Sequence, residues 1–289
     1  MMSASPAFTE HHIDRGEGRV TAHDYAGAGP AFVLMHGFPD NLRIWDDLVP
    51  HLVAAGRRVV TFDFLGFGAS DKPPGGYSFA QQLGDLEAVV AQLGLGPIVP
   101  VAHDSSGIAA VNFAIDHPGK VASLCILNSA YDDSPLNVWP DMITLFADPR
   151  LRDLALAMAQ SPAQMEWLLT WQKGKFEAPL PDVQKPHFEQ FMGPLIADNF
   201  VKAPGSGPAF VQMAAQFFDE LKRNSARLPL VSALDLPVKV IWGQYDAYLN
   251  VNMGRERAGR FRNSSFTLVP AGHWLQSDEP AMVAKAMLS

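Results

Sequence analysis

Short, continuous apolar runs recur along the first half of the chain, and longer segments with the spacing of amphipathic helices separate them. Such a run is typical of a strand that is buried on both faces. We expect strands of this kind at residues 31–35, 58–62, 97–102 and 121–127. We expect helices between them at about 42–55, 78–93 and 108–115. Strands and helices that alternate in this way predict an α/β fold, with a mostly parallel sheet and helices on both faces.

The beginning of the chain has a different pattern. Polar and apolar residues alternate over residues 8–25, around the segment Arg15-Gly16-Glu17-Gly18. Alternation with a period of two residues and a turn in the middle predicts an antiparallel hairpin at one edge of the sheet.

Residues 131–229 change the pattern again, because helical segments follow one another with no strand between them. We expect helices at 141–146, 151–160, 161–171 and 208–222, the third with Ser161 as its N-cap and Pro162 as its first residue. The sheet resumes at 238–242 and 265–269, and the last helices are expected at 252–260 and 280–288. The pattern therefore predicts a core in two parts, residues 1–130 and 230–289, with a helical cap at 131–229 inserted after the sixth strand.

The composition narrows the classes of partner. The chain has 289 residues, and 48% of them are hydrophobic, which is enough to bury a large core. Its formal net charge is -8 and it has no basic run, so neither a nucleic acid nor an anionic membrane surface is expected as a partner. A small molecule is the expected partner, and the sequence leaves the oligomeric state open.

The chain gives no signal for a cofactor, a metal or secretion. The loop at 63–70 contains Gly66 and Gly68 but lacks the third glycine and the helix of a dinucleotide site. A single cysteine, Cys125, lies in an apolar run and is expected to be a core residue. The segment Met1–His12 lacks the apolar region of a signal peptide, and no apolar stretch approaches the roughly 20 residues of a membrane span. We expect a soluble, cytoplasmic protein without cofactor or metal.

The turn after the strand at 97–102 carries the strongest chemical signal. Small residues surround it, as in a strand-to-helix elbow that exposes a nucleophile. The residues two before and two after the nucleophile must be small. With Asp104 at the apex, these are Ala102 and Ser106, whereas Ser105 at the apex would place His103 at a crowded position. Asp104 is therefore the expected nucleophile, and Ser105 is the alternative.

Two further polar residues follow predicted strands. Asp246 comes after the strand at 238–242, and His273 comes after the strand at 265–269. The carboxyl ends of parallel strands meet at one edge of a sheet. The order nucleophile, acid, histidine is the order of the elbow-containing hydrolases. We expect Asp104, Asp246 and His273 to form a catalytic triad, with an acid near Asp132 as the alternative to Asp246.

The motifs together resemble the α/β-hydrolase superfamily over nearly the whole chain. They are His36-Gly37-Phe38-Pro39, Asp63-Phe64-Leu65-Gly66-Phe67-Gly68-Ala69-Ser70-Asp71-Lys72-Pro73, the elbow, Gly243-Gln244-Tyr245-Asp246 and Gly272-His273-Trp274. The His103-Asp104 pair resembles the branch with an aspartate nucleophile, which contains epoxide hydrolases and haloalkane dehalogenases. The resemblance implies an α/β-hydrolase fold with an N-terminal hairpin and a helical cap.

The chemistry of a carboxylate nucleophile suits this branch. A carboxylate is already ionised and can displace a leaving group from an sp3 carbon, which produces an alkyl ester on Asp104. His273 then activates a water molecule that hydrolyses the ester, while Asp246 orients the imidazole. The backbone N–H groups of Phe38 and Ser105 are the expected oxyanion donors.

The leaving group depends on donors that the cap supplies. The resemblance implies a tryptophan directly after the nucleophile in haloalkane dehalogenases, where this chain has Ser105, and two cap tyrosines in epoxide hydrolases. The candidate donors of this chain are Tyr131, Trp139, Trp167, Trp171 and His187. We expect an epoxide of a small apolar molecule as substrate, with water as the second reactant. The alternatives are a haloalkane dehalogenase, an esterase that uses Ser105, and a ligand-binding member of the fold without catalysis.

Overall fold

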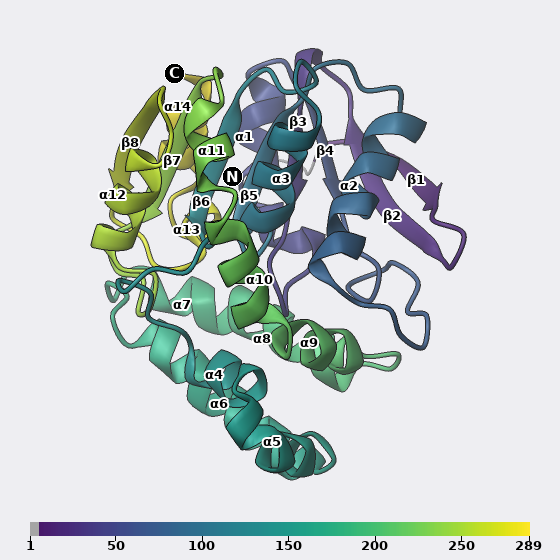
Figure 1. Ribbon diagram of the computed structural model, residues 1–289, viewed down its shortest axis with the longest axis vertical. Coiled ribbons are helices and arrows are strands. Elements are labelled where there is room, and N and C mark those ends of the chain that lie inside the picture. Colours follow the sequence, from purple (N-terminus) through teal and green to yellow (C-terminus); the bar gives the residue numbers. More distant parts are fainter. Residues whose placement is uncertain (1–5) are drawn as a thin grey trace.

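An eight-stranded sheet runs through the centre of the computed structural model, which describes residues 6–289 (Figure 1). The start of the segment Met1–His12 lies outside the described residues. The strand order is β1-β2-β4-β3-β5-β6-β7-β8. The hairpin strands β1 and β2 are antiparallel, β2 pairs with β4 in antiparallel fashion, and the remaining pairs are parallel. The strands are β1 (Thr9–Asp14), β2 (Arg19–Tyr25), β3 (Ala28–Met35), β4 (Arg57–Phe62), β5 (Val99–Asp104), β6 (Leu124–Ser129), β7 (Val238–Gly243) and β8 (Ser264–Val269).

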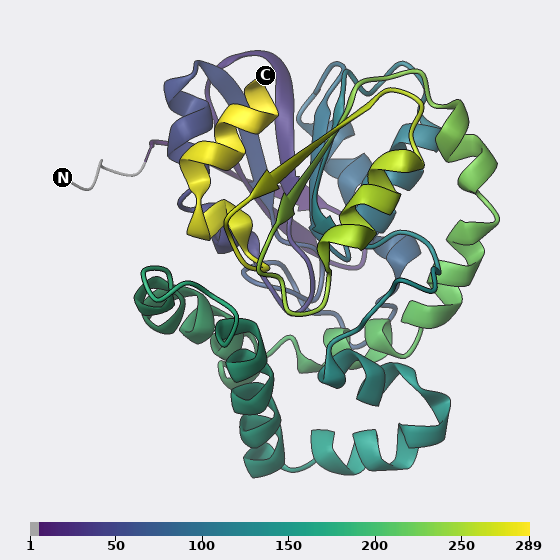
Figure 2. The same ribbon diagram turned by 90° about the vertical axis from the view of Figure 1, so that its left-hand side faces the viewer.

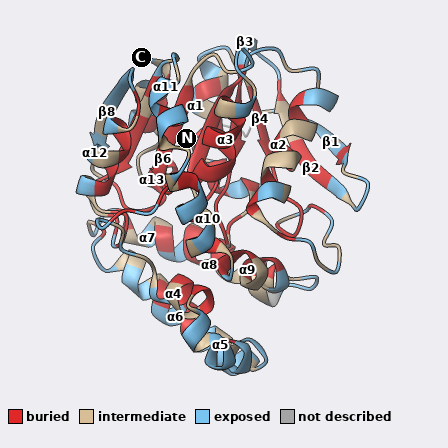
Figure 3. Ribbon diagram, viewed as in Figure 1, coloured by how far each residue is buried: buried red, intermediate tan, exposed pale blue. Residues whose placement is uncertain are grey.

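Helices cover both faces of the sheet (Figure 2). One face packs against α2 (Phe79–Gln92), α3 (Gly107–Asp116) and α12 (Val251–Gly259). The other face packs against η1 (Leu42–Trp45), α1 (Val49–Ala54), α13 (Leu275–Asp278) and α14 (Pro280–Leu288). The central strands are therefore buried on both sides (Figure 3), which explains their continuous apolar sequences. Cys125 is fully buried on β6.

The segment between β6 and β7 contains helices and, in the part that the structure describes, no strand. In both views, most of these helices lie at the carboxyl ends of the parallel strands, with α5 farthest from the sheet (Figures 1 and 2). They are α4 (Asp141–Ala147), η2 (Pro149–Leu151), α5 (Arg152–Ala159), α6 (Pro162–Glu177), α7 (Lys185–His187), the π-helix η3 (Phe188–Met192), α8 (Gly193–Val201), α9 (Gly207–Ala214), α10 (Phe217–Ser225) and α11 (Leu228–Ala233). We refer to α4–α11 as the insertion. The limits of the helical cap that the sequence predicts, residues 131 and 229, stay a prediction.

Two of the expected helices are divided. The segment 42–55 forms η1 and α1, because Pro50 lies in the first turn of α1 and lacks the N–H that a continuous helix would need. The segment 208–222 forms α9 and α10, and at the break the Gln216 amide reaches the backbone carbonyl of Tyr77 in the core. The Ser161 side chain makes no capping hydrogen bond to α6. Within residues 6–289, no helix combines the length and the apolar character that crossing a lipid bilayer requires.

Candidate active site

Asp104 ends β5 and lies at the apex of the turn into α3. Its φ angle of 53° is in the left-handed region, which a residue with a side chain rarely adopts. Ser106 helps to hold this conformation, because its hydroxyl accepts from the His103 N–H at 3.0 Å and donates to the Met35 carbonyl at 2.9 Å. The elbow is thus tied to the neighbouring strand β3.

Close approach of the backbone requires glycine on both sides of the elbow. A Cβ atom at Gly37 would lie 2.5 Å from the Cβ of Asp104. A Cβ atom at Gly107 would lie 2.7 Å from the carbonyl oxygen of Ala130. Neither distance is compatible with a side chain, so both glycines are needed to place the Asp104 carboxylate where it is.

The Asp104 carboxylate lies beside the two expected oxyanion donors. The backbone N–H groups of Ser105 and Phe38 act on it and favour its charged form. Burial raises the pKa of Asp104, while the charge of His273 and these N–H donors oppose the rise. The structure thus brings Asp104, Phe38 and Ser105 together in the arrangement expected of a nucleophile and its oxyanion hole.

His273 and Asp246 form a close pair next to this carboxylate. The His273 Nδ1 atom lies 2.6 Å from the Asp246 Oδ2 atom. Burial lowers the pKa of His273, but the carboxylates of Asp246, Asp104 and Asp40 outweigh it and raise the pKa to about 9. At neutral pH the imidazole is therefore charged, and the pair can hold a proton close to the nucleophile.

The Asp246 carboxylate is fixed by donors from the end of β6 and from the loop after β7. The Asn128 amide donates to its Oδ2 atom at 2.8 Å. The backbone N–H groups of Tyr248 and Leu249 donate to its Oδ1 atom at 2.9 and 3.0 Å. Asn128 was not predicted as a site residue, although its position at the carboxyl end of a buried strand could have indicated one.

Asp132, the alternative acid, has other partners. It is fully buried, with its Oδ1 atom against the Arg257 guanidinium and its Oδ2 atom 3.1 Å from the Arg260 guanidinium. Both arginines belong to or directly follow α12. The structure therefore pairs His273 with Asp246, and it places Asp132 in a separate ion-pair cluster.

Ser105, the alternative nucleophile, is buried beside the elbow. Its hydroxyl has no hydrogen-bond partner among the described residues, and His273 is not bonded to it. A serine nucleophile needs a neighbouring base to accept its proton. The geometry gives Ser105 no such base.

The triad opens onto a small cavity of about 50 Å3 between the sheet and the insertion. Its walls are mostly apolar, as is usual for a small-molecule site. Besides Asp104 and His273, its polar side chains are Asp40, Gln172 and Lys173. The remaining lining residues are Phe38, Pro39, Pro140, Met142, Ile143, Leu169, Phe176, Ile196, Phe210 and Trp274. A site of this size and polarity suits a small apolar molecule.

Asp40 is a polar wall residue that sequence reasoning missed. Its Oδ2 atom accepts from the Trp274 indole N–H at 3.0 Å, and its Oδ1 atom has no partner among residues 6–289. Burial raises the pKa of Asp40 to about 7, against the opposing effect of the Trp274 hydrogen bond. Asp40 can therefore hold a proton near neutral pH. In the sequence, its position directly after His36-Gly37-Phe38-Pro39 could have indicated that Asp40 belongs to the site.

The aromatic residues expected to donate to a leaving group do not line this cavity. Tyr131 donates to the Asn112 side chain at 2.9 Å. Trp139 packs edge-on against Phe217. Trp167 and Trp171 stack on each other at the surface, with 62% and 45% of their areas exposed. Helical spacing alone does not say which side of α6 faces the sheet.

His187, the other expected donor, joins the insertion to the core. Its Nε2 atom lies 3.0 Å from the Asp47 carboxylate and 2.8 Å from the Ser277 hydroxyl. The hydrogen bond to Asp47 raises the pKa of His187, while burial opposes the rise. This contact lies outside the triad cavity.

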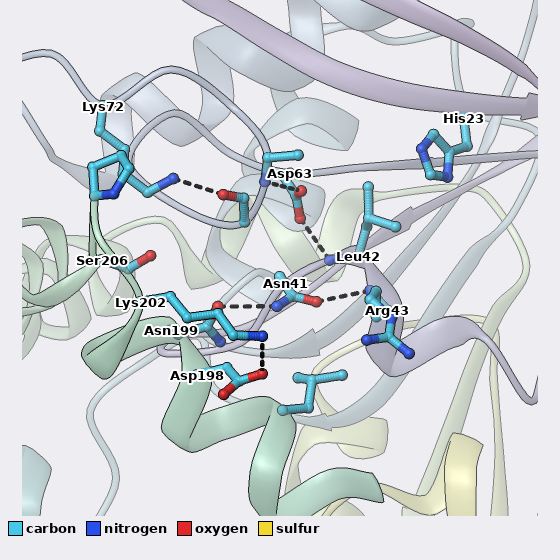
Figure 4. Close-up of a pocket in the computed structure, with 14 residues that line it drawn as sticks. His23, Asn41, Leu42, Arg43, Asp63, Lys72, Asp198, Asn199, Lys202 and Ser206 are labelled. Carbon is cyan, nitrogen blue, oxygen red and sulfur yellow. Dashed lines mark hydrogen bonds and ion pairs between the residues drawn. The ribbon is translucent and has the colours of Figure 1, made fainter. Parts of the chain in front are cut away.

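A larger cavity of about 340 Å3 lies elsewhere between the core and the insertion (Figure 4). Its polar groups bond to one another or to the backbone. Lys202 pairs with Asp198 at 2.5 Å, Lys72 donates to the Gly68 carbonyl at 2.6 Å, and Asp63 accepts from the Leu42 N–H at 2.6 Å. No triad residue lines it. The smaller cavity is thus the candidate active site.

The comparison with known families identifies the fold family of the chain. The model of the alpha/beta hydrolase fold family matches residues 30–280. The chain belongs to the alpha/beta hydrolase fold family. The match confirms the superfamily and the fold that the sequence motifs predicted, and it makes the protein a hydrolase of this fold.

The relatives of this alpha/beta hydrolase include two groups whose names state an activity, the epoxide hydrolases and the dehalogenases. Over 295 residues it is 27% identical to epoxide hydrolase 3 of Xenopus tropicalis, covering 97% of the chain and 77% of the relative. Over 276 residues it is 26% identical to a haloalkane dehalogenase of Mesorhizobium japonicum, covering 91% and 85%. Over 107 residues it is 39% identical to a fluoroacetate dehalogenase of Burkholderia sp., a match that spans only 35% of either chain. The two groups are about equally similar.

Proposed function

We propose that this alpha/beta hydrolase acts through an alkyl ester on Asp104 and that its substrate is an epoxide of a small apolar molecule. One observation carries the proposal. Asp104, and not Ser105, occupies the strained elbow position, where two N–H groups and the charged His273–Asp246 pair surround its carboxylate.

In the first step, an Asp104 oxygen attacks an epoxide carbon. A bond forms between that oxygen and the carbon, and the carbon–oxygen bond of the ring breaks with its electron pair remaining on the ring oxygen. The oxygen then takes up a proton. Asp40 and His273 are both within the site and both can hold a proton near neutral pH.

In the second step, His273 without its proton accepts one from water, and the resulting hydroxide attacks the carboxyl carbon of the ester. The Phe38 and Ser105 N–H groups stabilise the oxyanion that forms. Collapse of this intermediate breaks the ester and releases the diol, so Asp104 regains its carboxylate. Asp246 holds the imidazole and stabilises its charged form.

The proton demand of the first step favours an epoxide over a carbon–halogen bond. A halide leaves as a stable anion, whereas an opened epoxide must be protonated. The acidic groups in the cavity can supply protons that a dehalogenase does not need.

A dehalogenase is the second candidate. The dehalogenase relatives favour it, and so does Gln172, because a neutral N–H donor is sufficient for a departing halide. Catalysis by Ser105 and binding without catalysis have no comparable support in the cavity.

The test separates the mechanism from the substrate class. A His273→Gln variant blocks the second step, so incubation with styrene oxide should add the mass of the epoxide to the peptide that contains Asp104. An adduct on Ser105 would overturn the mechanism. For the unchanged protein, diol formation from epoxides is measured beside halide release from 1-bromobutane, and release of halide alone would overturn the epoxide proposal.

A further inference from the structure

The leaving group needs a donor, and the insertion places two polar side chains on the wall of the triad cavity. They are Gln172 and Lys173, which are neighbours on α6. Gln172 has only 7% of its area exposed, whereas Lys173 is half-buried. Burial raises the pKa of Glu177, and the positive charge of Lys173 opposes this rise. Gln172 is thus the more enclosed of the two and has no competing charge.

The orientation of the Gln172 amide is fixed by its partners. Its Oε1 atom accepts from the Met142 backbone N–H at 3.0 Å, so the NH2 group must lie on the opposite side. The NH2 group donates to the Tyr248 hydroxyl at 2.9 Å. An amide nitrogen carries two hydrogens, and within residues 6–289 the second has no acceptor.

Tyr248 makes this arrangement rigid. Its hydroxyl donates to the Asp141 carboxylate at 2.8 Å, so the oxygen is left to accept from Gln172. Burial raises the pKa of Tyr248 to about 12, so the hydroxyl keeps its proton. The backbone N–H of Tyr248 also binds Asp246 at 2.9 Å. One residue therefore anchors both Gln172 and the triad acid.

We propose that the second Nε2–H of Gln172 donates to the leaving-group oxygen as it becomes negative during attack by Asp104. Gln172 is then a catalytic residue, and Tyr248 and Asp141 are positioning residues. The inference rests on the proposed function. It assigns a hydrogen-bond donor to the leaving group. Ser105 and the aromatic residues of the insertion do not supply one.

The proposed role is electrostatic and leaves the proton balance unchanged. The electron pair of the breaking carbon–oxygen bond goes to the ring oxygen, and the Gln172 N–H shares in a hydrogen bond without being transferred. The oxygen takes its proton from Asp40 or His273, as in the proposed first step. A fixed donor in a closed site stabilises a developing charge more than water does, since it needs no reorientation during the reaction.

The experiment measures ester formation alone. In the His273→Gln background, where Asp40 remains as the proton source of the first step, the rate of ester formation on Asp104 is followed by rapid quenching and mass measurement with styrene oxide, with and without Gln172→Met. Loss of one such donor slows the step by about 10²- to 10³-fold. Lys175→Met is the matched control on the same helix, because Lys175 is exposed and lies outside the cavity wall, and we expect its rate to change less than about threefold.

The two possible failures are distinct. No ester on Asp104 when Gln172 is present would contradict the proposed function. Equal rates of ester formation with and without Gln172 would contradict the inference. If Gln172→Met does not fold, as judged by thermal unfolding, Gln172→Glu preserves the shape and the acceptor for Met142. At neutral pH its carboxylate should slow ester formation at least as much, and an unchanged rate would again overturn the inference.

The leaving group supplies a further readout that a purely structural role would not affect. Para-substituted styrene oxides and phenyl glycidyl ethers differ in how much charge gathers on the ring oxygen. The loss caused by Gln172→Met should grow with that charge. A constant loss across the series would indicate that Gln172 only supports the fold of the cavity.

Discussion

The two walls of the triad cavity are built in different ways. The core wall consists of strand ends and short turns, where the elbow geometry positions Asp104 and backbone N–H groups hydrogen-bond to Asp246. The insertion wall consists of helix faces, where packing decides which side chain points inward. The core wall therefore carries the proposed reacting groups, and the insertion wall carries Gln172, the proposed donor to the leaving group.

The largest expected effect is on the core wall, at Asp104. Asp104→Ala removes the nucleophile, and kcat should fall by about 10⁵-fold because no ester can form. The measurement is diol formation together with peptide mass after incubation with substrate. Activity within tenfold of the unchanged protein would mean that another residue reacts.

Asp246→Asn should have the next largest effect. It removes the charge that stabilises the His273 imidazolium, and the rate should fall by about 10⁴-fold with the fold intact. Asp132→Asn is the matched control. Its buried ion pairs with Arg257 and Arg260 are weakened, so the unfolding free energy should fall by about 3–5 kcal/mol while the folded protein keeps its rate. The reverse pattern would make Asp132 the triad acid.

The pH dependence comes next in size. Ester hydrolysis requires His273 without its proton, so its rate should rise about tenfold per pH unit until the pKa is passed. The pKa of about 9 belongs to the protein with a charged Asp104. Esterification removes that charge, so the midpoint should lie below 9. Single-turnover measurements over a pH series test this, and a midpoint above 9 would contradict it.

Ester formation should also slow on acidification, but because of a different group. The step requires the Asp104 carboxylate, and burial raises the pKa of Asp104. The rate of ester formation should therefore fall on acidification at a pH above the ordinary range of a carboxyl group.

The smallest expected effect concerns the contact between the insertion and the core. His187→Ala removes the bonds to Asp47 and Ser277, which are partly exposed to solvent. Such pairs contribute about 1 kcal/mol or less, so the melting temperature should fall by only a few degrees. The ratio kcat/KM should stay within about threefold. A hundredfold loss would mean that this contact reaches the site.

The same contrast explains how much of the protein could be predicted from its sequence. Strands at 31–35 and 121–127 were predictable because continuous apolar runs need burial on both faces. Asp104, Asp246 and His273 could be placed together because each follows a strand of one parallel sheet. Their catalytic roles stay predictions.

The insertion was less predictable for a physical reason. Trp167 and Trp171 lie one turn apart on α6, and that spacing is equally compatible with a wall residue and a surface residue. The structure turns this face outward and the neighbouring Gln172 inward. The packing of α6 against α4, α5 and Tyr248 decides the rotation, and the contact with Tyr248 joins segments that are far apart in the chain.

The close approach of Gly37 to Asp104 has a consequence for how such a site can change during evolution. Positions 37 and 107 touch no substrate, yet any side chain there would displace the nucleophile or its supporting loop. Wall residues such as Leu169 and Ile143 have no such restriction, since they only bound the cavity. These two glycines should therefore tolerate substitution less well than the residues that line the cavity, although residues that meet a substrate are usually expected to be the more restricted. The glycines that pack against the elbow are fixed, while the residues that only bound the cavity are free to vary and to bring new substrates to an unchanged nucleophile.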